Sequence, residues 1–405
     1  MATTPQPVPP RPVRPTIDLE YIVDTLFTLL AIPSPVGYTD QVVRWTGEEL
    51  ERLGIPFELT RRGAIRADLA GQRSSPDRAV VAHLDTLGAM VSSVKPDGRL
   101  GIAPIGTWSS RFAEGARVTV LGAGGARRGT ILPLKASGHT FDSEVDSQET
   151  SWNHVEIRLD ECVVSAEDVR ELIVGVGDYV ALDPQPERTK SGFINSRYLD
   201  DKAGVAIVLA AVKAISESEE TLPVDCHVIF TISEEVGSGS SHTLHGDVAE
   251  MVTIDSASQA PGQNSSEFTV NIAMMDSSGP LDYHLTRKLL RLCHEYGLPY
   301  RRDVFKYYRS DSASAVDAGN DLRTAIACFG VDASHGWERT HERSLMSLAE
   351  LVTLYMLSPP TSMRDSAEMA SLEGFSTQPT EPAPPTRPED VDIPPETDVE
   401  PDVSG

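Results

Sequence analysis

The chain has 405 residues, of which 40% are hydrophobic, and it carries a formal net charge of -25 at pH 7. This length predicts a full hydrophobic core and about two domains. The acidic balance excludes nucleic acid as a partner, because phosphates require a basic surface. No segment has the apolar length of a membrane span, so we expect no membrane contact.

The two ends of the chain have compositions that are typical of disordered segments. Residues 1–15 are rich in proline and lack the apolar core of a signal peptide. Residues 361–405 are acidic and proline-rich, which predicts a solvated tail, with docking to a partner as the alternative. The four cysteines contain no CxxC pair and are expected to be free buried thiols in a reducing cytoplasm.

Between these ends, helical and strand patterns alternate. Amphipathic patterns predict two helices over residues 17–30 and 40–53, and short strands are expected at 57–60 and 64–70. Further helices are predicted over three later segments, 203–215, 283–296 and 345–357. Short β-branched runs without polar alternation indicate strands that are buried on both faces. The predicted fold class is therefore α/β, with a mixed, largely parallel sheet flanked by helices.

The sequence pattern changes between about residues 94 and 191, where short glycine-rich segments follow one another. This pattern predicts an inserted β-rich domain, within which Ser165–Leu172 resembles a capped short helix. The α/β domain would then be discontinuous, formed by residues 16–93 and 192–360.

Four apolar runs are each followed by residues that bind metals well. They lead to His83 and Asp85, to Glu234 and Glu235, to Asp255, which is expected to end its strand, and to the late histidines His335 and His341. Ligands of open parallel sheets bind beyond the carboxyl ends of the strands. The collected histidines and carboxylates therefore predict a metal site, and a hydrolytic one.

Each motif also has a structural interpretation. His83 and Asp85 share one face of a strand, so Asp85 can orient a ligating His83, although a core histidine looks the same. One of two adjacent glutamates can bind a metal while the other acts as general base on a metal-activated water; a solvated strand end is the alternative. Asp200-Asp201 precedes a predicted helix. The pair can serve as an acidic helix cap, or it can supply a carboxylate that bridges two cations.

The ordered motifs HLD, LDDKAG and SEEVG, then an aspartate and a late histidine, resemble the dinuclear-zinc exopeptidases. The likeness is greatest to the tetrahedral aminopeptidase family, which includes glutamyl and deblocking aminopeptidases, and it covers roughly residues 16–358. In that family an inserted β-rich domain lies between the first two motifs. The chain is also similar to a branch found with synthesis of an N-acetylglutaminylglutamine amide osmoprotectant.

The resemblance implies two divalent metal ions, Zn²⁺ or alternatively Co²⁺ or Mn²⁺, and assigns their ligands. His83 and Asp255 would hold one ion, Glu235 and a late histidine the other, and Asp200 would bridge them. Glu234 would be the general base and Asp85 the carboxylate that orients His83. His341 is favoured as the late ligand because it lies just before the last helix, whereas His335 is an alternative ligand or, like Asp311, lies near the substrate. Lys202 stands where the family has arginine.

The predicted function is that of a cytoplasmic metallo-aminopeptidase that removes the N-terminal residue of short peptides. A metal-dependent amidohydrolase or deacylase acting on an N-acylated amino acid or dipeptide is the alternative. A catalytically silent binding protein is a third hypothesis, which the presence of every expected ligand disfavours. The resemblance also implies a homo-oligomer that assembles through the inserted domain.

Overall fold

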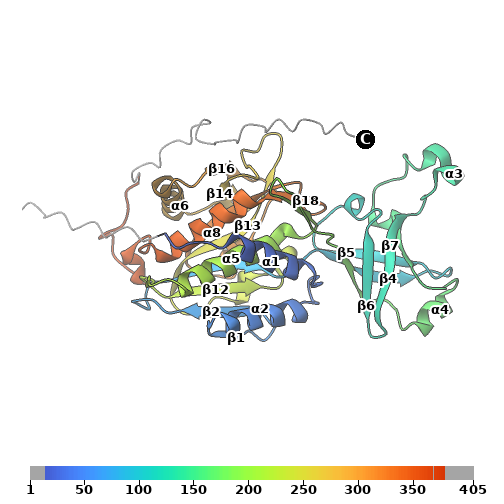
Figure 1. The fold of residues 1–405 in the computed structure, drawn as a ribbon, viewed down its shortest axis with the longest axis horizontal. Helices are drawn as coiled ribbons and strands as arrows, with labels where there is room; N and C mark the ends of the chain where they lie inside the picture. The colour runs from blue at the N-terminus through green and yellow to red at the C-terminus, as the bar shows by residue number, and fades with distance from the viewer. Residues whose placement is uncertain (1–13, 368, 379–405) are drawn as a thin grey trace, which may run out of the picture.

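The computed structural model describes residues 14–367 and 369–378, which form an α/β body and a β-barrel that projects from it (Figure 1). The predicted fold class, with its inserted β-rich domain, is confirmed. Most of the two ends predicted to be disordered, residues 1–15 and 361–405, lies outside the described residues.

The body is built on one mixed sheet, in which twelve strands are described, with the order β1-β2-β12-β3-β13-β17-β18-β11-β10. In addition, β14 pairs with β17, and β15 and β16 pair with β14. The central strands β12, β3, β13 and β17 are parallel. The strands are β1 (Phe57–Leu59), β2 (Ile65–Leu69), β3 (Asp77–His83), β10 (Glu187–Arg188), β11 (Phe193–Ser196), β12 (Cys226–Thr231), β13 (Val248–Gln259), β14 (Val270–Asp276), β15 (Gly279–Pro280), β16 (Tyr300–Val304), β17 (Arg323–Asp332) and β18 (Glu338–His341).

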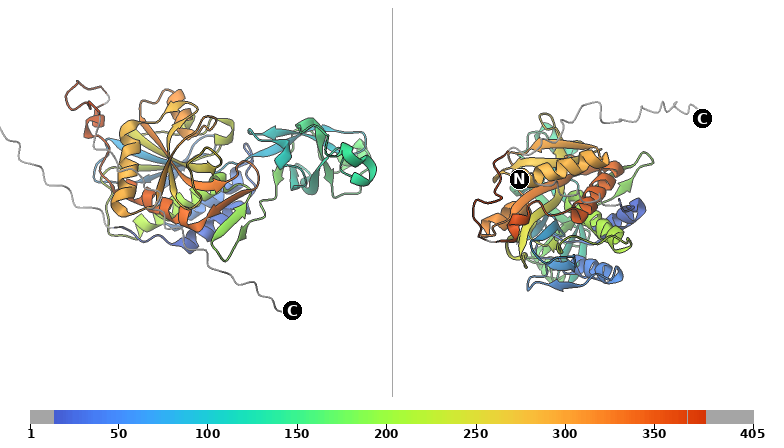
Figure 2. Two further views of the ribbon diagram at one scale, coloured as in Figure 1. Left: turned by 90° about the horizontal axis from the view of Figure 1, so that it is seen from above. Right: turned by 90° about the vertical axis from the view of Figure 1, so that its left-hand side faces the viewer.

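Apolar side chains cover both faces of the central strands, as expected for a parallel sheet between helices. On β3, Val80 and Ala82 join the larger core, whereas the alternate residues Ala79 and Val81 join a smaller core on the opposite face. Figure 2 shows the helices packed along the sheet. The helices of the body are α1 (Leu19–Leu30), α2 (Asp40–Arg52), α5 (Leu199–Ser216), α6 (Tyr283–Tyr296), α7 (Asp311–Asp317) and α8 (Glu342–Leu357).

The strand that carries Asp255 is longer than its apolar run indicates. Asp255 was predicted to end its strand, which is wrong, because β13 continues to Gln259. The extension pairs with β17 in register, with Asp255 opposite Cys328 and Gln259 opposite Asp332. Backbone pairing with a neighbouring strand therefore carries β13 past its last large apolar residue.

The insertion is a closed barrel with the strand order β4-β5-β8-β7-β6-β9. It begins at β4, ahead of the predicted boundary at residue 94, and its small core includes Val118, Val120 and Ile157. Ser165 caps α4 through a reciprocal capping box with Asp168. The elements are β4 (Gly88–Val94), β5 (Leu100–Ile105), β6 (Arg117–Gly122), β7 (Gly125–Pro133), β8 (Val155–Leu159), β9 (Tyr179–Leu182), α3 (Gly138–Phe141) and α4 (Ala166–Glu171).

A buried ion-pair cluster joins the sheet to α6 and α8. The Glu250 carboxylate lies 3.2 Å from Arg78 Nη2 and 3.3 Å from Lys288 Nζ, and it accepts a hydrogen bond from the Tyr355 hydroxyl. Burial raises the pKa of Glu250, but the positive charges of Lys288 and Arg78 outweigh this effect and lower the pKa to about 2. Removing one partner of such a cluster leaves an uncompensated buried charge.

The four cysteines are free, but they are not all buried as predicted. Cys226, Cys293 and Cys328 are buried, whereas Cys162 on the barrel is exposed. Across residues 14–367 and 369–378, no helix is both long and apolar enough to cross a membrane.

Candidate metal centre

Two histidines face the two oxygens of Asp200 at the carboxyl ends of the central strands. His83, the last residue of β3, places Nε2 3.1 Å from Asp200 Oδ1. His335, in the loop after β17, places Nε2 3.8 Å from Asp200 Oδ2. A carboxylate whose oxygens face two separate imidazoles has the arrangement expected of a bridging ligand.

The opposite ring nitrogens show that the two Nε2 atoms are acceptors in the neutral histidines. His83 Nδ1 lies 2.9 Å from the Asp85 carbonyl oxygen, and His335 Nδ1 lies 2.8 Å from the Thr107 carbonyl oxygen. A carbonyl only accepts, so each Nδ1 carries the hydrogen and each neutral Nε2 keeps its lone pair. Both lone pairs then point at the Asp200 carboxylate. At the 3.1 Å separation of His83 Nε2 and Asp200 Oδ1, either a proton or a cation must lie between the two atoms.

Three further carboxylates surround this pair of histidines. Glu235 Oε2 lies 3.9 Å from His335 Nε2, and Glu234 Oε2 lies 3.8 Å from His83 Nε2. Oxygens of Asp255 and Asp200 approach within 4.8 Å of each other. An open pocket of about 670 Å³ in front of them is lined by Thr107, Asp200, Glu234, Glu235, Asp255, Tyr308, Arg309 and His335.

The buried carboxylates of the centre repel one another. Burial, with neighbouring carboxylates adding to it, raises the pKa of Glu234 and Glu235 well above their ordinary value and that of Asp255 to about 8. Burial opposes a positive charge on His83, but the hydrogen bond with Asp200 and the other nearby carboxylates raise its pKa well above 6.5. Glu235 Oε1 is buried without a hydrogen-bond partner among the described residues. Divalent cations would compensate both the burial and the repulsion, so this donor set fits a metal centre.

The contacts of Asp85 differ from the expected hydrogen bond between its carboxylate and the His83 ring. Its carbonyl oxygen, not its carboxylate, contacts His83 Nδ1, and the nearest carboxylate oxygen lies 3.8 Å from that nitrogen. The carboxylate instead accepts hydrogen bonds from the backbone N–H groups of Glu234 and Glu235, at 3.2 and 3.1 Å. Asp85 therefore holds the short 3₁₀ turn Glu234–Val236 in place.

His341 does not lie with the other predicted ligands. Its Nε2 lies 2.9 Å from the Ser191 carbonyl oxygen, and its Nδ1 accepts a hydrogen bond from the Arg343 N–H at 3.1 Å. Both ring nitrogens are thus occupied, and the contact with Arg343 caps the N-terminus of α8. The geometry brings His335 to the carboxylates in its place.

Two other residues singled out from the sequence also serve the scaffold. Asp311 accepts hydrogen bonds from the Thr231 hydroxyl and the Ser240 N–H, at 2.7 and 2.6 Å, and it does not line the pocket. Lys202 Nζ donates to the carbonyl oxygens of Leu29 and Ile32 at the end of α1. This favours the ammonium form, whereas burial alone lowers the pKa of Lys202 to about 7.

Glu338 is a residue of the centre that sequence reasoning missed. Its buried carboxylate accepts hydrogen bonds from the backbone N–H groups of His335 and Asp200, at 3.0 and 3.1 Å. It therefore links Asp200 to the loop that carries His335. Its position, three residues after His335 in a short strand, was the available signal.

Comparison with known proteins identifies the family. The family model for M42 glutamyl aminopeptidases matches residues 63–351. The chain is 37% identical over 332 residues to a protein of Bacillus subtilis (strain 168) named "Putative aminopeptidase YhfE", covering 82% of this chain and 96% of that one. It is 26% identical over 222 residues to the glutamyl aminopeptidase of Lactococcus lactis subsp. cremoris (strain MG1363), covering 53% and 60% of the two chains.

The fold is also that of known peptidases. The TET1 peptidase of Pyrococcus horikoshii matches with a TM-score of 0.74 at 20% identity, over 84% of this chain and all of that chain. The family model covers most of the chain, including every residue of the centre. The resemblance predicted from the motifs is confirmed: the chain belongs to the M42 glutamyl aminopeptidase family and is a metallo-aminopeptidase.

Proposed function

We propose that the centre binds two divalent cations, most simply Zn²⁺, and hydrolyses the N-terminal peptide bond of short peptides. His83, Asp200 and Asp255 would hold one cation, and Asp200, Glu235 and His335 the other. The observation that carries this assignment is the pair of Nε2 lone pairs that face the two oxygens of Asp200. In this assignment, His335 takes the place of the expected ligand His341. When bound, such cations lower the pKa of water and polarise a carbonyl group.

We propose Glu234 as the general base. Its side chain lines the pocket and is 12% exposed, whereas that of Glu235 is 4% exposed. The Glu234 carboxylate would accept a proton from water as the water oxygen bonds to the scissile carbonyl carbon. The same group would then deliver that proton to the departing amine nitrogen as the C–N bond breaks. Asp85 supports this role because it fixes the backbone of Glu234.

The acidic lining of the pocket supports a substrate that carries a free, positively charged N-terminus. Asp200, Glu234, Glu235 and Asp255 line it, opposed by Arg309 and His335. An N-acylated amino acid or dipeptide would lack that charge. Assaying matched dipeptides with free and N-acetylated termini decides between them. Faster cleavage of the acetylated series would establish the deacylase instead.

Metal dependence gives the direct test of the centre. Chelation should abolish hydrolysis, and Zn²⁺ or Co²⁺ should restore it in proportion to the cations bound at the centre. Full hydrolysis by protein that is demonstrably free of metal would overturn the proposal.

We propose that the chain assembles into a homo-oligomer through its barrel and acts in the cytoplasm. The TET1 peptidase of Pyrococcus horikoshii is described as assembling into a tetrahedron or a large octahedral shell, which supports the first part. The free cysteines support the second. The native mass in solution tests the assembly, and a monomer would contradict it.

A further inference from the structure

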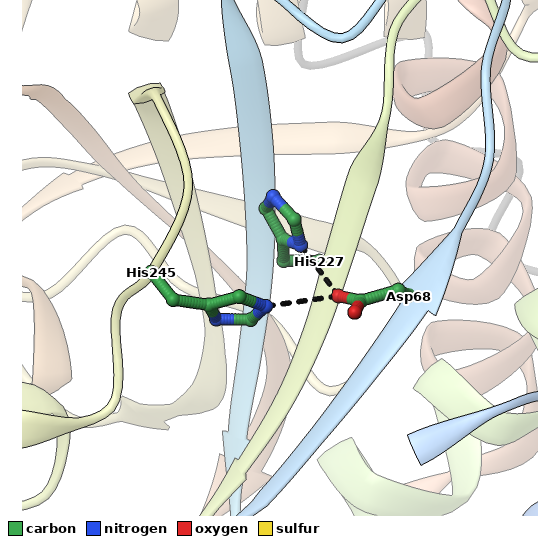
Figure 3. Close-up of side chains that lie close together, drawn as sticks. All are labelled: Asp68, His227 and His245. Atoms are coloured by element: carbon green, nitrogen blue, oxygen red, sulfur yellow. Dashed lines mark hydrogen bonds and ion pairs between the residues drawn. The ribbon is translucent and has the colours of Figure 1, made fainter. Parts of the chain in front are cut away.

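A second group of possible metal ligands lies at the other end of β12. Asp68 on β2, His227 on β12 and His245 in the loop before β13 point toward one another (Figure 3). Asp68 Oδ1 lies 2.6 Å from His227 Nδ1 and 3.0 Å from His245 Nε2. The two imidazole rings are 4.2 Å apart between centroids. One carboxylate oxygen and two imidazole nitrogens therefore converge on one point.

This group is separate from the catalytic centre. Asp68 and His227 are register partners in the antiparallel pair β2–β12. His227 lies four positions before Thr231, which is paired with His83 of the catalytic centre. At the usual rise of a strand these positions are about 13 Å apart.

In its neutral form, His227 can satisfy only one of the two carboxylates that face its ring. Its Nδ1 faces Asp68 Oδ1, and its Nε2 lies 3.3 Å from Asp77 Oδ2. A neutral imidazole has a single N–H and can donate to only one of these carboxylates. A second ring proton would satisfy both carboxylates, and so would a cation at Nδ1, because Nε2–H then donates to Asp77. A carboxylate that orients a ligating histidine through its other nitrogen is a recurrent feature of metal sites.

The loop that carries His245 is held in position. Arg66 on β2 donates to three successive carbonyl oxygens of this loop, those of His242, Thr243 and Leu244. Gly246 has φ +70°, and a Cβ there would lie 2.9 Å from His227 Nε2. Glycine thus allows the loop to pass close to His227, and the backbone that precedes His245 is fixed before any cation arrives.

We propose that Asp68, His227 and His245 form an additional binding site for a transition-metal cation of the Zn²⁺ class. Two imidazoles and a carboxylate are common zinc donors, with metal–ligand distances of about 2.0–2.2 Å. Tetrahedral donors at these distances lie about 3.4 Å apart, so the present separations of 2.6 and 3.0 Å must widen by roughly 0.8 and 0.4 Å. The Asp68 side chain is 54% exposed and that of His245 is 27% exposed, so both can adjust. Water or another ligand would complete the coordination.

A cation at this site would join β2 and β12 to the loop before β13. Its expected effect is on stability, because none of its ligands lines the catalytic pocket. The site therefore has readouts that do not depend on hydrolysis.

The test uses the full chain and the variants Asp68→Asn and His245→Gln, which replace the more exposed ligands. His242→Gln is the matched control, because His242 lies on the same loop and contacts Ser241, not Asp68. Each protein is stripped with chelator, reloaded with Zn²⁺ and separated from unbound metal before zinc is measured. Both ligand variants should hold about one zinc fewer per chain than the wild type and the control.

Thermal unfolding gives a second readout. The increase in Tm on adding Zn²⁺ should be smaller in both ligand variants than in the control, by roughly 3–6 °C. The comparison between variants holds whether the catalytic centre binds one or two cations, so its outcome is independent of the proposed mechanism. Equal zinc content and equal Tm increments in all four proteins would overturn the additional site.

Discussion

Replacing Glu338 by glutamine should weaken cation binding at the second catalytic position without removing a ligand. Glu338 Oε1 accepts from the His335 N–H and Oε2 from the Asp200 N–H. In the variant, one of these backbone groups must face an amide NH₂, which cannot accept. An unsatisfied buried donor costs about 1–3 kcal/mol.

That cost should fall mainly on metal affinity. His335 has φ +59° and a side chain that is 37% exposed, so its loop can relax when no cation is bound. A bound cation fixes His335 beside Asp200 and restores the unfavourable contact. The affinity for one cation should therefore fall by roughly 10–100-fold, as is usual when a group that orients a metal ligand is lost.

The assay is competition with a chelator of known affinity, followed by measurement of bound metal and of hydrolysis. Glu267→Gln is the matched control, because Glu267 is equally buried but pairs with Arg339. Glu338→Gln should release one cation at chelator concentrations that leave Glu267→Gln fully loaded, and excess Zn²⁺ should restore its activity. Unchanged affinity, or the same loss in both variants, would refute the positioning role of Glu338.

Three further predictions concern the glutamate pair, the two late histidines and the buried ion-pair cluster. Glu234→Gln should keep its metals but lose about 10²–10⁴-fold in kcat, whereas Glu235→Gln should lose one cation; metal analysis that shows the reverse would exchange their roles. His335→Ala should lose one cation. His341→Ala should keep its full metal content and lose only about 1 kcal/mol of unfolding free energy, because a helix cap is removed. Loss of metal from His341→Ala would restore His341 as the ligand. Glu250→Gln should cost about 3 kcal/mol of unfolding free energy at pH 7, because its folded pKa lies near 2 and its ordinary pKa is 4.5. This contribution is present above pH 4.5 and is lost as the pH falls toward 2, so denaturation curves of wild type and variant should converge in acid.

Local patterns were sufficient to predict most elements of the fold. Residues 283–296 were predicted as a helix and form α6 with the same bounds, because apolar periodicity and the Asp282 cap act within a few turns. The buried central strands follow from their apolar composition in the same way. The end of β13 could not be predicted, since pairing with β17 carries it beyond its apolar run.

The residue types of the proposed metal ligands were also evident from the sequence, because carboxylates and histidines after buried strands are costly without compensation. The sequence did not decide which late histidine joins them. Their neighbours in space distinguish the two. The Thr107 carbonyl binds Nδ1 of His335 and leaves its Nε2 to face Asp200. Ser191 and Arg343 bind both ring nitrogens of His341.

The additional cluster depended on tertiary structure alone. Asp68 and His227 are 159 positions apart in the chain, and antiparallel pairing of β2 with β12 brings them together. No local pattern encodes that meeting, because each residue by itself is an ordinary polar side chain near a strand end. The sequence by itself therefore determined the elements, the family and the types of ligand. Strand register and loop placement determined which side chains converge, because convergence depends on contacts between segments that are distant in the chain.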